Sequence, residues 1–384
     1  MSLEIKSKLP EVGTTIFTVM SKMAQDYGAI NLSQGFPDFE PDSRLLDRVS
    51  HHLQTQKNQY PPMIGVPALR QAIAQKLQQY SNIDVNPDTE ITITSGATEA
   101  LFCAIHAVVA PGDEVIVFDP AYDSYEPAVS LAGGTTTHIP MSWPDYKIDW
   151  QQLKDSISEK TRLVVINSPH NPTASILTGD DLNQLAAIVE PYNCYVLSDE
   201  VYEHIIFDGH THASALSHEL LRQRSFAVFS FGKTYHATGW KIGYAIAPEG
   251  LTAEFRKIHQ FNAFTTVTPM QWALADFVVS NPENFLELSS FYQHKRDLFR
   301  SLIEPSRFKP LVSGGTYFQL ADYSEISDMN DMDFASWMTQ EKGVAVIPLS
   351  PFYQSPPPES RIIRFCFAKQ DATLKEAAEL ICAV

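Results

Sequence analysis

Two lysines stand eight residues apart in a glycine-rich stretch of the chain, SFGKTYHATGWKIGY (230–244). Lys233 and Lys241 have no acidic residue beside them there, and the apolar segment SFAVF (225–229) comes directly before them. A lysine amine can form a Schiff base with an aldehyde, and a second cation close by can bind a phosphate. We therefore interpret Lys233 as the residue that reacts with a carbonyl carbon, and Lys241, together with Ser230, as a phosphate ligand.

Polar residues also follow three other apolar segments that the sequence predicts to be strands. The motif SGAT follows ITIT and opens a helix, whose first amides, those of Ala97 and Thr98, would bind the same phosphate. Asn171 lies in the turn after VVIN, and Asp199 and Tyr202 follow CYVL. Ligands of an open α/β sheet bind beyond the carboxyl ends of its strands, so we expect these residues to meet there.

These residue types suit a phosphate-bearing aromatic aldehyde. Asp199 would keep a ring nitrogen protonated, which turns the ring into an electron sink. Tyr202 and Asn171 would hydrogen-bond a ring hydroxyl, and Tyr122, in DPAYDSY, would stack on the ring face. Each residue alone has an ordinary structural explanation, as a helix cap, a turn residue or a solvated lysine. Their occurrence together, each after a strand, favours a binding site.

The elements that must position these residues alternate along the middle of the chain. Short apolar strands are predicted in ITITSG, DEVIVFDP, RLVVINSP, CYVLSDE and SFAVFSF, and helical periodicity in GVPALRQAIAQKLQQY and ATEALFCAIHAVV. Apolar strands separated by helices are typical of a largely parallel sheet that is covered on both faces. We therefore expect an α/β fold in this region.

The pattern changes on either side of that region. Residues 1–40 are predicted to be irregular, and residues 248–305 to be mainly helical. Residues 306–384 mix the strands GTYFQLAD, GVAVIPL and RIIRFCFA with helices near the end, which indicates a second, smaller α+β unit. We expect a large domain over residues 45–275, and a small domain formed by residues 1–44 together with residues 276–384.

The overall composition excludes several classes of function. The 384 residues are 44% hydrophobic and 19% charged, with a formal net charge of −17, so the chain can bury a core and shows no basic patch for nucleic acid. No apolar run reaches the roughly 18–20 residues of a membrane helix, and the first residues, MSLEIKSKLP, lack an apolar signal segment. The four cysteines have no C-x-x-C spacing, which is typical of reduced thiols. We expect a cytoplasmic protein without nucleic-acid or membrane partners.

The histidines are interpreted as solvated. His51 and His52 are adjacent, and His204, His210 and His212 fall in a polar loop, without the further ligands that a metal centre needs. We therefore predict no metal.

Taken together, the motifs resemble those of the class I, fold type I, aminotransferases, which use pyridoxal 5′-phosphate. The resemblance covers nearly the whole chain and rests on the segments NLSQGFPDF, NQYPPMIGVPALR, SGATEAL, DPAYDSY, NSPHNPT, SDEVYEH, IIRFCFAK and the lysine stretch. The chain looks most like the kynurenine, glutamine and methionine aminotransferases. The resemblance implies a large domain with a mostly parallel seven-stranded sheet and a smaller α+β domain.

The resemblance also implies roles for residues that their types alone leave undecided. Arg364, in IIRFCF, matches the arginine that grips the substrate α-carboxylate, which a planar guanidinium pairs with bidentately. Gly35 and the Asn171 side chain match further contacts to that carboxylate. Tyr60 matches a tyrosine that reaches the cofactor phosphate of the neighbouring subunit, which implies a homodimer with shared active sites. Many family members have arginine where Lys241 stands.

The implied activity moves the amino group of an amino acid to a 2-oxo acid by a ping-pong mechanism. No second arginine is evident for a distal carboxylate, since Arg256 and Lys257 lie in a helical stretch that we expect to be solvated. A large neutral amino acid is therefore expected as donor, with methionine first and aromatic amino acids or glutamine as further candidates. A cysteine-S-conjugate β-lyase would use the same cofactor residues and stays open as an alternative. A cofactor-sensing regulator is disfavoured, because no DNA-binding segment is evident.

Overall fold

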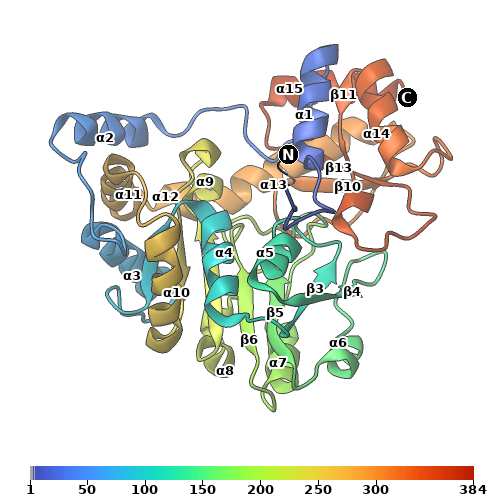
Figure 1. Cartoon of the computed structure of the whole chain (residues 1–384). Helices are drawn as coiled ribbons and strands as arrows, with labels where there is room; N and C mark the ends of the chain where they lie inside the picture. Colours follow the sequence, from blue (N-terminus) through green and yellow to red (C-terminus); the bar gives the residue numbers. More distant parts are fainter. Residues whose placement is uncertain (1–2, 4) are drawn as a thin grey trace.

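A seven-stranded sheet forms the centre of the molecule, which a computed structural model describes for residue 3 and residues 5–384 (Figure 1). The strand order is β2-β8-β7-β6-β5-β3-β4. Every neighbouring pair is parallel except the two that involve β8, which runs antiparallel to β2 and to β7. The strands are β2 (Ile91–Thr94), β3 (Glu114–Asp119), β4 (Thr135–Pro140), β5 (Thr161–Asn167), β6 (Tyr195–Asp199), β7 (Ser225–Ser230) and β8 (Gly243–Ile246). The prediction of a mostly parallel seven-stranded sheet is confirmed.

Helices cover both faces of this sheet because its strands are apolar on both sides. In β5, Leu163 and Val165 pack with residues of α4, whereas Val164 and Ile166 pack with residues of α7. Successive side chains of a strand point to opposite faces, so one short strand contributes to two cores. The helices of this region are α2 (Ser43–Gln54), α3 (Pro67–Ser81), α4 (Gly96–Val108), α5 (Tyr125–Ala132), α6 (Trp150–Ser156), α7 (Gly179–Val189), α8 (Glu219–Arg222), α9 (Phe231–Thr234), α10 (Glu249–Asn262), α11 (Thr268–Ser280) and α12 (Glu283–Leu286).

A second group of elements combines the beginning and the end of the described chain. An antiparallel sheet has the order β12-β13-β10-β9, and β1 pairs with β11 in a parallel two-stranded sheet. Helix α1 lies beside α14 in this group, as the blue and orange ribbons show (Figure 1). The elements are α1 (Ile16–Tyr27), β1 (Ile30–Asn31), α13 (Leu288–Ile303), β9 (Lys309–Pro310), β10 (Phe318–Asp322), α14 (Asp331–Glu341), β11 (Val344–Ala345), β12 (Ile347–Pro348), β13 (Ile362–Cys366) and α15 (Asp371–Cys382). The exact boundary between the two domains stays a prediction.

The prediction that residues 1–40 are irregular is wrong for residues 16–27 and 30–31, and residues 1, 2 and 4 lie outside the described residues. Helix α1 begins after Thr15, whose side chain accepts a hydrogen bond from the Thr18 amide, and it ends at Gly28, which has a left-handed φ of 62°. Its buried face, Ile16, Met20 and Ala24, follows helical spacing. The segment GVAVIPL also differs from expectation, because it forms two short strands in different sheets.

Three of the four cysteines are buried and free, and Cys382 is exposed and free. Among the residues that the structure describes, no helix combines the length and the apolar character that crossing a membrane requires.

Candidate active site

A cavity of about 230 Å³ opens where the strands β5, β6 and β7 end and where α4 begins. This is the edge at which ligands of open α/β sheets bind. The structure therefore brings together most of the residues that the sequence singled out. Those that line the cavity are Gly35, Ala97, Thr98, Tyr122, Asn171, Asp199, Tyr202, Ser230, Lys233 and Lys241.

Lys233 lies in the single-turn helix α9, directly after β7, and its amine faces the cavity. Its Nζ donates hydrogen bonds to the Tyr317 hydroxyl oxygen at 2.9 Å and to the Gly35 carbonyl oxygen at 3.3 Å. Burial lowers the pKa of the Lys233 amine to about 8, because the charged form loses its hydration. A substantial fraction of this amine is therefore neutral near pH 8, and a neutral amine can act as a nucleophile or as a base.

The start of α4 forms a cradle for an anion at the other end of the cavity. The Lys241 Nζ donates to the Thr98 hydroxyl oxygen at 3.4 Å. Gly96 has a φ of 75°, and a Cβ there would lie 3.2 Å from Lys241 Cε and 3.3 Å from Lys241 Nζ. The amides in the first turn of a helix have no hydrogen-bond partner within the helix. The amides of Ala97 and Thr98 therefore add the positive end of the α4 dipole to this cradle. The Lys241 amine, the Thr98 hydroxyl and the amides of Ala97 and Thr98 together fit a phosphate.

Asp199 is the last residue of β6 and is buried. Burial raises the pKa of its carboxyl to about 6, whereas the hydrogen bond that the Tyr125 hydroxyl donates to Oδ2 at 2.7 Å acts in the opposite direction. The carboxylate is therefore ionised above about pH 6 in spite of its burial. A negative oxygen fixed at the edge of the cavity can hold a proton on a ring nitrogen.

Arg364 lies in the middle of β13 and is fully buried. One terminal nitrogen donates to the Asn171 side-chain oxygen at 2.6 Å and the other to the Ser33 carbonyl oxygen at 3.2 Å. The Arg364 Nε has no hydrogen-bond partner, and no carboxylate forms an ion pair with this guanidinium among the residues that the structure describes. The guanidinium does not line the cavity wall itself, but Asn171 does. A buried cation with an unused donor fits the carboxylate of a small ligand.

Tyr60 is the predicted residue that the structure does not bring to this cavity. It lies between α2 and α3 and is 86% exposed. Its nearest aromatic neighbour is Phe264, with ring centroids 5.8 Å apart. Within a single chain Tyr60 therefore contacts none of the predicted cofactor residues.

Comparison with known proteins identifies the family. The chain matches the family described as aminotransferase class I and II over residues 27–381. The chain belongs to this family. It is 51% identical to methionine aminotransferase from Escherichia coli strain K12 over 374 residues, which cover 97% of each chain. It is 34% identical to mouse kynurenine–oxoglutarate transaminase 3, with 99% of this chain and 90% of that one covered.

Solved structures agree with this aminotransferase assignment. An E. coli crystal structure whose report identifies a methionine aminotransferase function superposes with a TM-score of 0.97 at 50% identity, with both chains fully covered. The N-succinyldiaminopimelate aminotransferase of Mycobacterium tuberculosis superposes with a TM-score of 0.95 at 34% identity, with 99% of this chain and 100% of that one covered. Aminotransferases of this class use pyridoxal phosphate, so the expected family, fold and cofactor are confirmed.

Residues that the sequence did not single out line the cavity of this aminotransferase or contact the residues that line it. Tyr317 contacts Lys233, Tyr125 contacts Asp199, and Asn167 accepts a hydrogen bond from the Asn171 amide at 2.8 Å. Asn167 ends β5 as Asp199 ends β6, so the strand-end rule could have found it. Tyr317 precedes a strand of the other sheet, and no local pattern connects it with Lys233.

The prediction that the histidines are solvated is wrong for three of them. His52 is buried against Asp276, and His212 and His204 lie within salt-bridge distance of Glu200 and Glu203 respectively. Buried polar side chains need such partners. His52 is buried and His204 and His212 are half-buried, whereas residues 208–211 between the latter two are exposed.

The prediction that Arg256 is solvated is wrong as well. Its guanidinium donates to the Thr92 hydroxyl and to the carbonyl oxygens of Asp88 and Ile91. Arg256 therefore ties α10 to the edge strand β2, away from the cavity lining.

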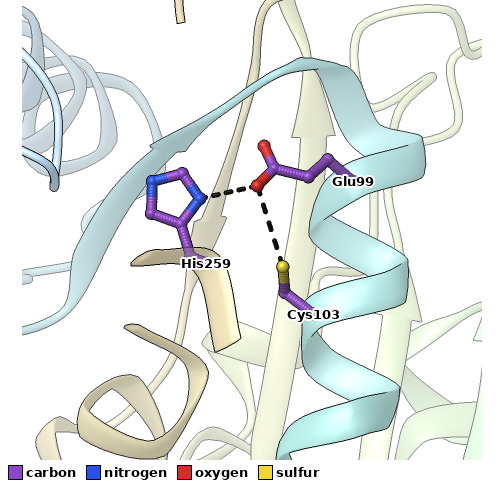
Figure 2. Close-up of side chains that lie close together, drawn as sticks. All are labelled: Glu99, Cys103 and His259. Carbon is purple, nitrogen blue, oxygen red and sulfur yellow. Dashed lines mark hydrogen bonds and ion pairs between the residues drawn. The ribbon is translucent and has the colours of Figure 1, made fainter. Parts of the chain in front are cut away.

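Glu99, Cys103 and His259 form a buried cluster with metal-ligand chemistry between α4 and α10 (Figure 2). The His259 Nδ1 lies 2.6 Å from Glu99 Oε1, and its Nε2 donates to the Met63 carbonyl oxygen at 2.9 Å. Burial raises the pKa of the Cys103 thiol to about 12, which keeps its proton on sulfur. Hydrogen bonds within the protein thus account for the donors of this cluster without a metal ion.

Proposed function

We propose that this aminotransferase takes the amino group from a large neutral amino acid, with methionine as the preferred donor, and passes it to a 2-oxo acid. The observation that carries the proposal is one cavity with Lys233 at one end, an anion cradle at the other and the buried Arg364 behind Asn171. The 51% identity to an E. coli methionine aminotransferase supports methionine.

The residues present fit the phosphate and the ring of the cofactor. Gly96 leaves the space in which a Cβ would crowd the Lys241 amine, so the cradle stays open. We assign the phosphate to Ser230, Lys241 and the amides of Ala97 and Thr98. The remaining cofactor contacts are Asp199 at the ring nitrogen, Tyr202 and Asn171 at the ring hydroxyl, and Tyr122 at the ring face.

Lys233 is the catalytic residue of this proposal. When bound, pyridoxal phosphate supplies a carbonyl carbon and an electron-withdrawing ring. Lys233 holds the cofactor before the substrate arrives, and its freed Nζ then accepts the proton from the substrate Cα. Arg364, the Asn171 side chain and the backbone at Gly35 orient the α-carboxylate, which fixes the Cα proton near that amine.

The lining of the cavity supports a neutral side chain on the substrate. Lys233 and Lys241 are the cations that line it, and both have other roles in this proposal. A substrate with a second carboxylate would need a further cation, and none lines the cavity in the described part of the chain. Phe36, Leu101 and Ile242 contribute apolar surface instead.

We further propose a homodimer in which Tyr60 completes the site of the partner subunit. Tyr60 lies in an exposed apolar patch with residues from the end of α10 and the loop after it. The exposed fractions of this patch, which we name the Tyr60 surface, are 86% for Tyr60, 86% for Phe261, 41% for Phe264 and 49% for Val267. Large apolar patches on a surface mark sites of association. Three buried free cysteines support a cytoplasmic location, because reduced thiols persist there.

An absorption spectrum tests the proposed reaction. The purified protein is loaded with pyridoxal phosphate, and the spectrum is recorded before and after L-methionine is added without a 2-oxo acid. Replacement of the pyridoxal band by a pyridoxamine band shows that the amino group has moved to the cofactor and that methionine is a donor.

The other outcomes are equally specific. An unchanged pyridoxal band would exclude methionine as an amino donor, and aromatic amino acids would then be tested as donors. Release of pyruvate and ammonia from a cysteine conjugate would instead establish β-elimination. Failure to bind pyridoxal phosphate at all would overturn the role of Lys233.

A further inference from the structure

Three polar atoms meet at the Lys233 end of the cavity. The Tyr317 hydroxyl donates to the Gly35 carbonyl oxygen at 2.6 Å, while the Lys233 Nζ lies 2.9 Å from the Tyr317 oxygen and 3.3 Å from the same carbonyl oxygen. A carbonyl oxygen only accepts hydrogen bonds, so the hydroxyl hydrogen of Tyr317 is committed to Gly35. The Tyr317 oxygen therefore accepts from Lys233.

This arrangement restricts the direction of the lysine lone pair. A neutral amine has two N–H bonds and one lone pair. The Tyr317 oxygen and the Gly35 carbonyl oxygen lie 2.6 Å apart on the same side of Nζ, and they accept from Lys233 on that side. The lone pair of the neutral amine therefore points away from these two oxygens, and Lys233 lines the cavity.

We propose that Tyr317 is a positioning residue that aims the lone pair of the freed Lys233 amine at the substrate Cα. This inference rests on the proposed function, because it concerns the stage at which Lys233 acts as a base. A base that must reorient before each proton transfer reacts more slowly than one that is already oriented.

The surroundings of Tyr317 hold its hydroxyl in place. The side chain is fully buried, and its ring lies 5.1 Å from that of Tyr202 and 5.6 Å from that of Tyr292, measured between centroids. Gly35 is equally restricted, since a Cβ there would lie 2.9 Å from the Phe318 ring. Neither hydrogen-bond acceptor of Lys233 can move without displacing packed side chains.

The matched test compares Tyr317→Phe with Tyr292→Phe. Both variants remove one buried hydroxyl from the same aromatic cluster, but the Tyr292 hydroxyl has no hydrogen-bond partner in the described part of the chain. The rate of the first half-reaction is measured in a single turnover with methionine and with methionine deuterated at Cα. We expect roughly a 10- to 100-fold slower rate and a larger isotope effect for Tyr317→Phe only.

A second measurement needs no cofactor and no turnover. Trace labelling of the cofactor-free protein with acetic anhydride at a series of pH values gives the pKa of the Lys233 amine. The Tyr317 oxygen stabilises the protonated amine most, because a charged donor makes the stronger hydrogen bond. Its removal in Tyr317→Phe should therefore shift the labelling midpoint of Lys233 to lower pH, and Tyr292→Phe should leave it unchanged.

The outcomes separate this inference from the proposed function. Equal rates, isotope effects and labelling midpoints in the two variants would overturn the role of Tyr317 while wild-type turnover still supports transamination. A wild-type protein without turnover on any neutral amino acid overturns the proposed function instead. Melting temperatures confirm that both variants fold, and Tyr317→Met, which also lacks the hydroxyl, repeats the comparison should Tyr317→Phe be unstable.

Discussion

Burial makes the Lys233 amine reactive, because it disfavours the charged form. Burial lowers its pKa to about 8, and no carboxylate lies within salt-bridge distance of it among the residues that the structure describes. Asp199 shows the complementary case, because burial raises its pKa to about 6 while Tyr125 stabilises the ionised form. Burial therefore favours the neutral form of both groups and moves both pKa values toward neutral pH, which suits an acid–base reaction there.

The capture of pyridoxal phosphate by the cofactor-free protein should depend on pH through Lys233. Only the neutral amine attacks a carbonyl carbon, so the rate should rise with pH through a midpoint near 8 rather than near the ordinary 10.5. Stopped-flow absorbance at a series of pH values measures this midpoint. A midpoint above pH 10 would contradict the influence of burial, and Lys233→Ala should show no covalent phase at any pH.

Replacement of Arg364 by lysine should weaken substrate binding. Lysine keeps the positive charge but loses the planar fork that binds a carboxylate through two hydrogen bonds. One lost charged hydrogen bond costs about 1.5–3 kcal/mol, which corresponds to a decrease in kcat/KM of roughly 10- to 100-fold. Steady-state kinetics with methionine measures the change.

The control for this variant is Arg256→Lys. Arg256 makes three hydrogen bonds to Thr92, Asp88 and Ile91 outside the cavity lining. Its replacement should affect the melting temperature rather than kcat/KM. Equal losses of kcat/KM in both variants would show that Arg364 acts through stability alone.

The junction of β2, β8 and α4 shows how elements build the anion cradle. Gly243, at the start of β8, has no room for a Cβ, which would lie 2.5 Å from the Phe229 carbonyl oxygen and 2.9 Å from the Ala97 amide. This close contact places the lysine loop directly against the first turn of α4. The phosphate ligands from residues 230–241 and from α4 therefore come together through backbone packing.

Gly96→Ala should weaken both stability and cofactor binding. A left-handed φ of 75° costs a residue with a Cβ about 1–2 kcal/mol, and the new methyl group would press on the Lys241 amine at 3.3 Å. Chemical denaturation and titration with pyridoxal phosphate measure the two effects.

Gly250→Ala is the control, because Gly250 lies in α10 with nothing within 4 Å of its Cβ position. Alanine at this position should stabilise the protein by up to about 1 kcal/mol. Unchanged cofactor affinity in Gly96→Ala would contradict the cradle.

Site residues that directly follow a strand could be predicted from the sequence, whereas residues that reach the site from distant elements could not. Asn171, Asp199 and Lys233 follow apolar strands, so a rule about strand ends found them. Tyr317 escaped because it reaches Lys233 from a position 84 residues further along the chain. Helix α1 was missed, although Ile16, Met20 and Ala24 follow helical spacing and Thr15 and Gly28 cap it at either end.

The single chain leaves the Tyr60 surface exposed, which bears on the assembly of the whole molecule. Tyr60 and Phe261 are each 86% exposed, and apolar side chains of this size are usually covered in a working protein. Sequence resemblance predicted a contact from Tyr60 to a second subunit, and one chain by itself cannot make that contact. The proposed dimer would cover the patch and complete both sites.

Phe261→Glu should convert the proposed dimer into a monomer, because burying an unpaired charge in the interface is costly. The monomer should bind the cofactor more weakly, because Tyr60 would then be absent from the partner's site. Sedimentation velocity measures the assembly, and titration with pyridoxal phosphate measures the affinity. Leu380→Glu is the control, since Leu380 is 37% exposed and lies in α15, which packs against α13, whereas α10 packs against α4; the two helices lie apart in Figure 1. A wild-type monomer with full activity would refute the shared site.

The pairing of β1 with β11 has a consequence for how the protein is made. Residues 30–33 are fixed by Val344 and Ala345 through strand pairing, by the Cys366 amide at 2.8 Å from the Leu32 carbonyl oxygen, and by Arg364. The ribosome produces residues 30–35 more than 300 residues before those partners. Lys233 therefore leaves the ribosome long before the Gly35 carbonyl oxygen can be held beside it. A nascent chain that stalls before residue 344 would hold a lysine with no fixed partner at Gly35, so the reactive centre is among the last parts of the molecule to be completed.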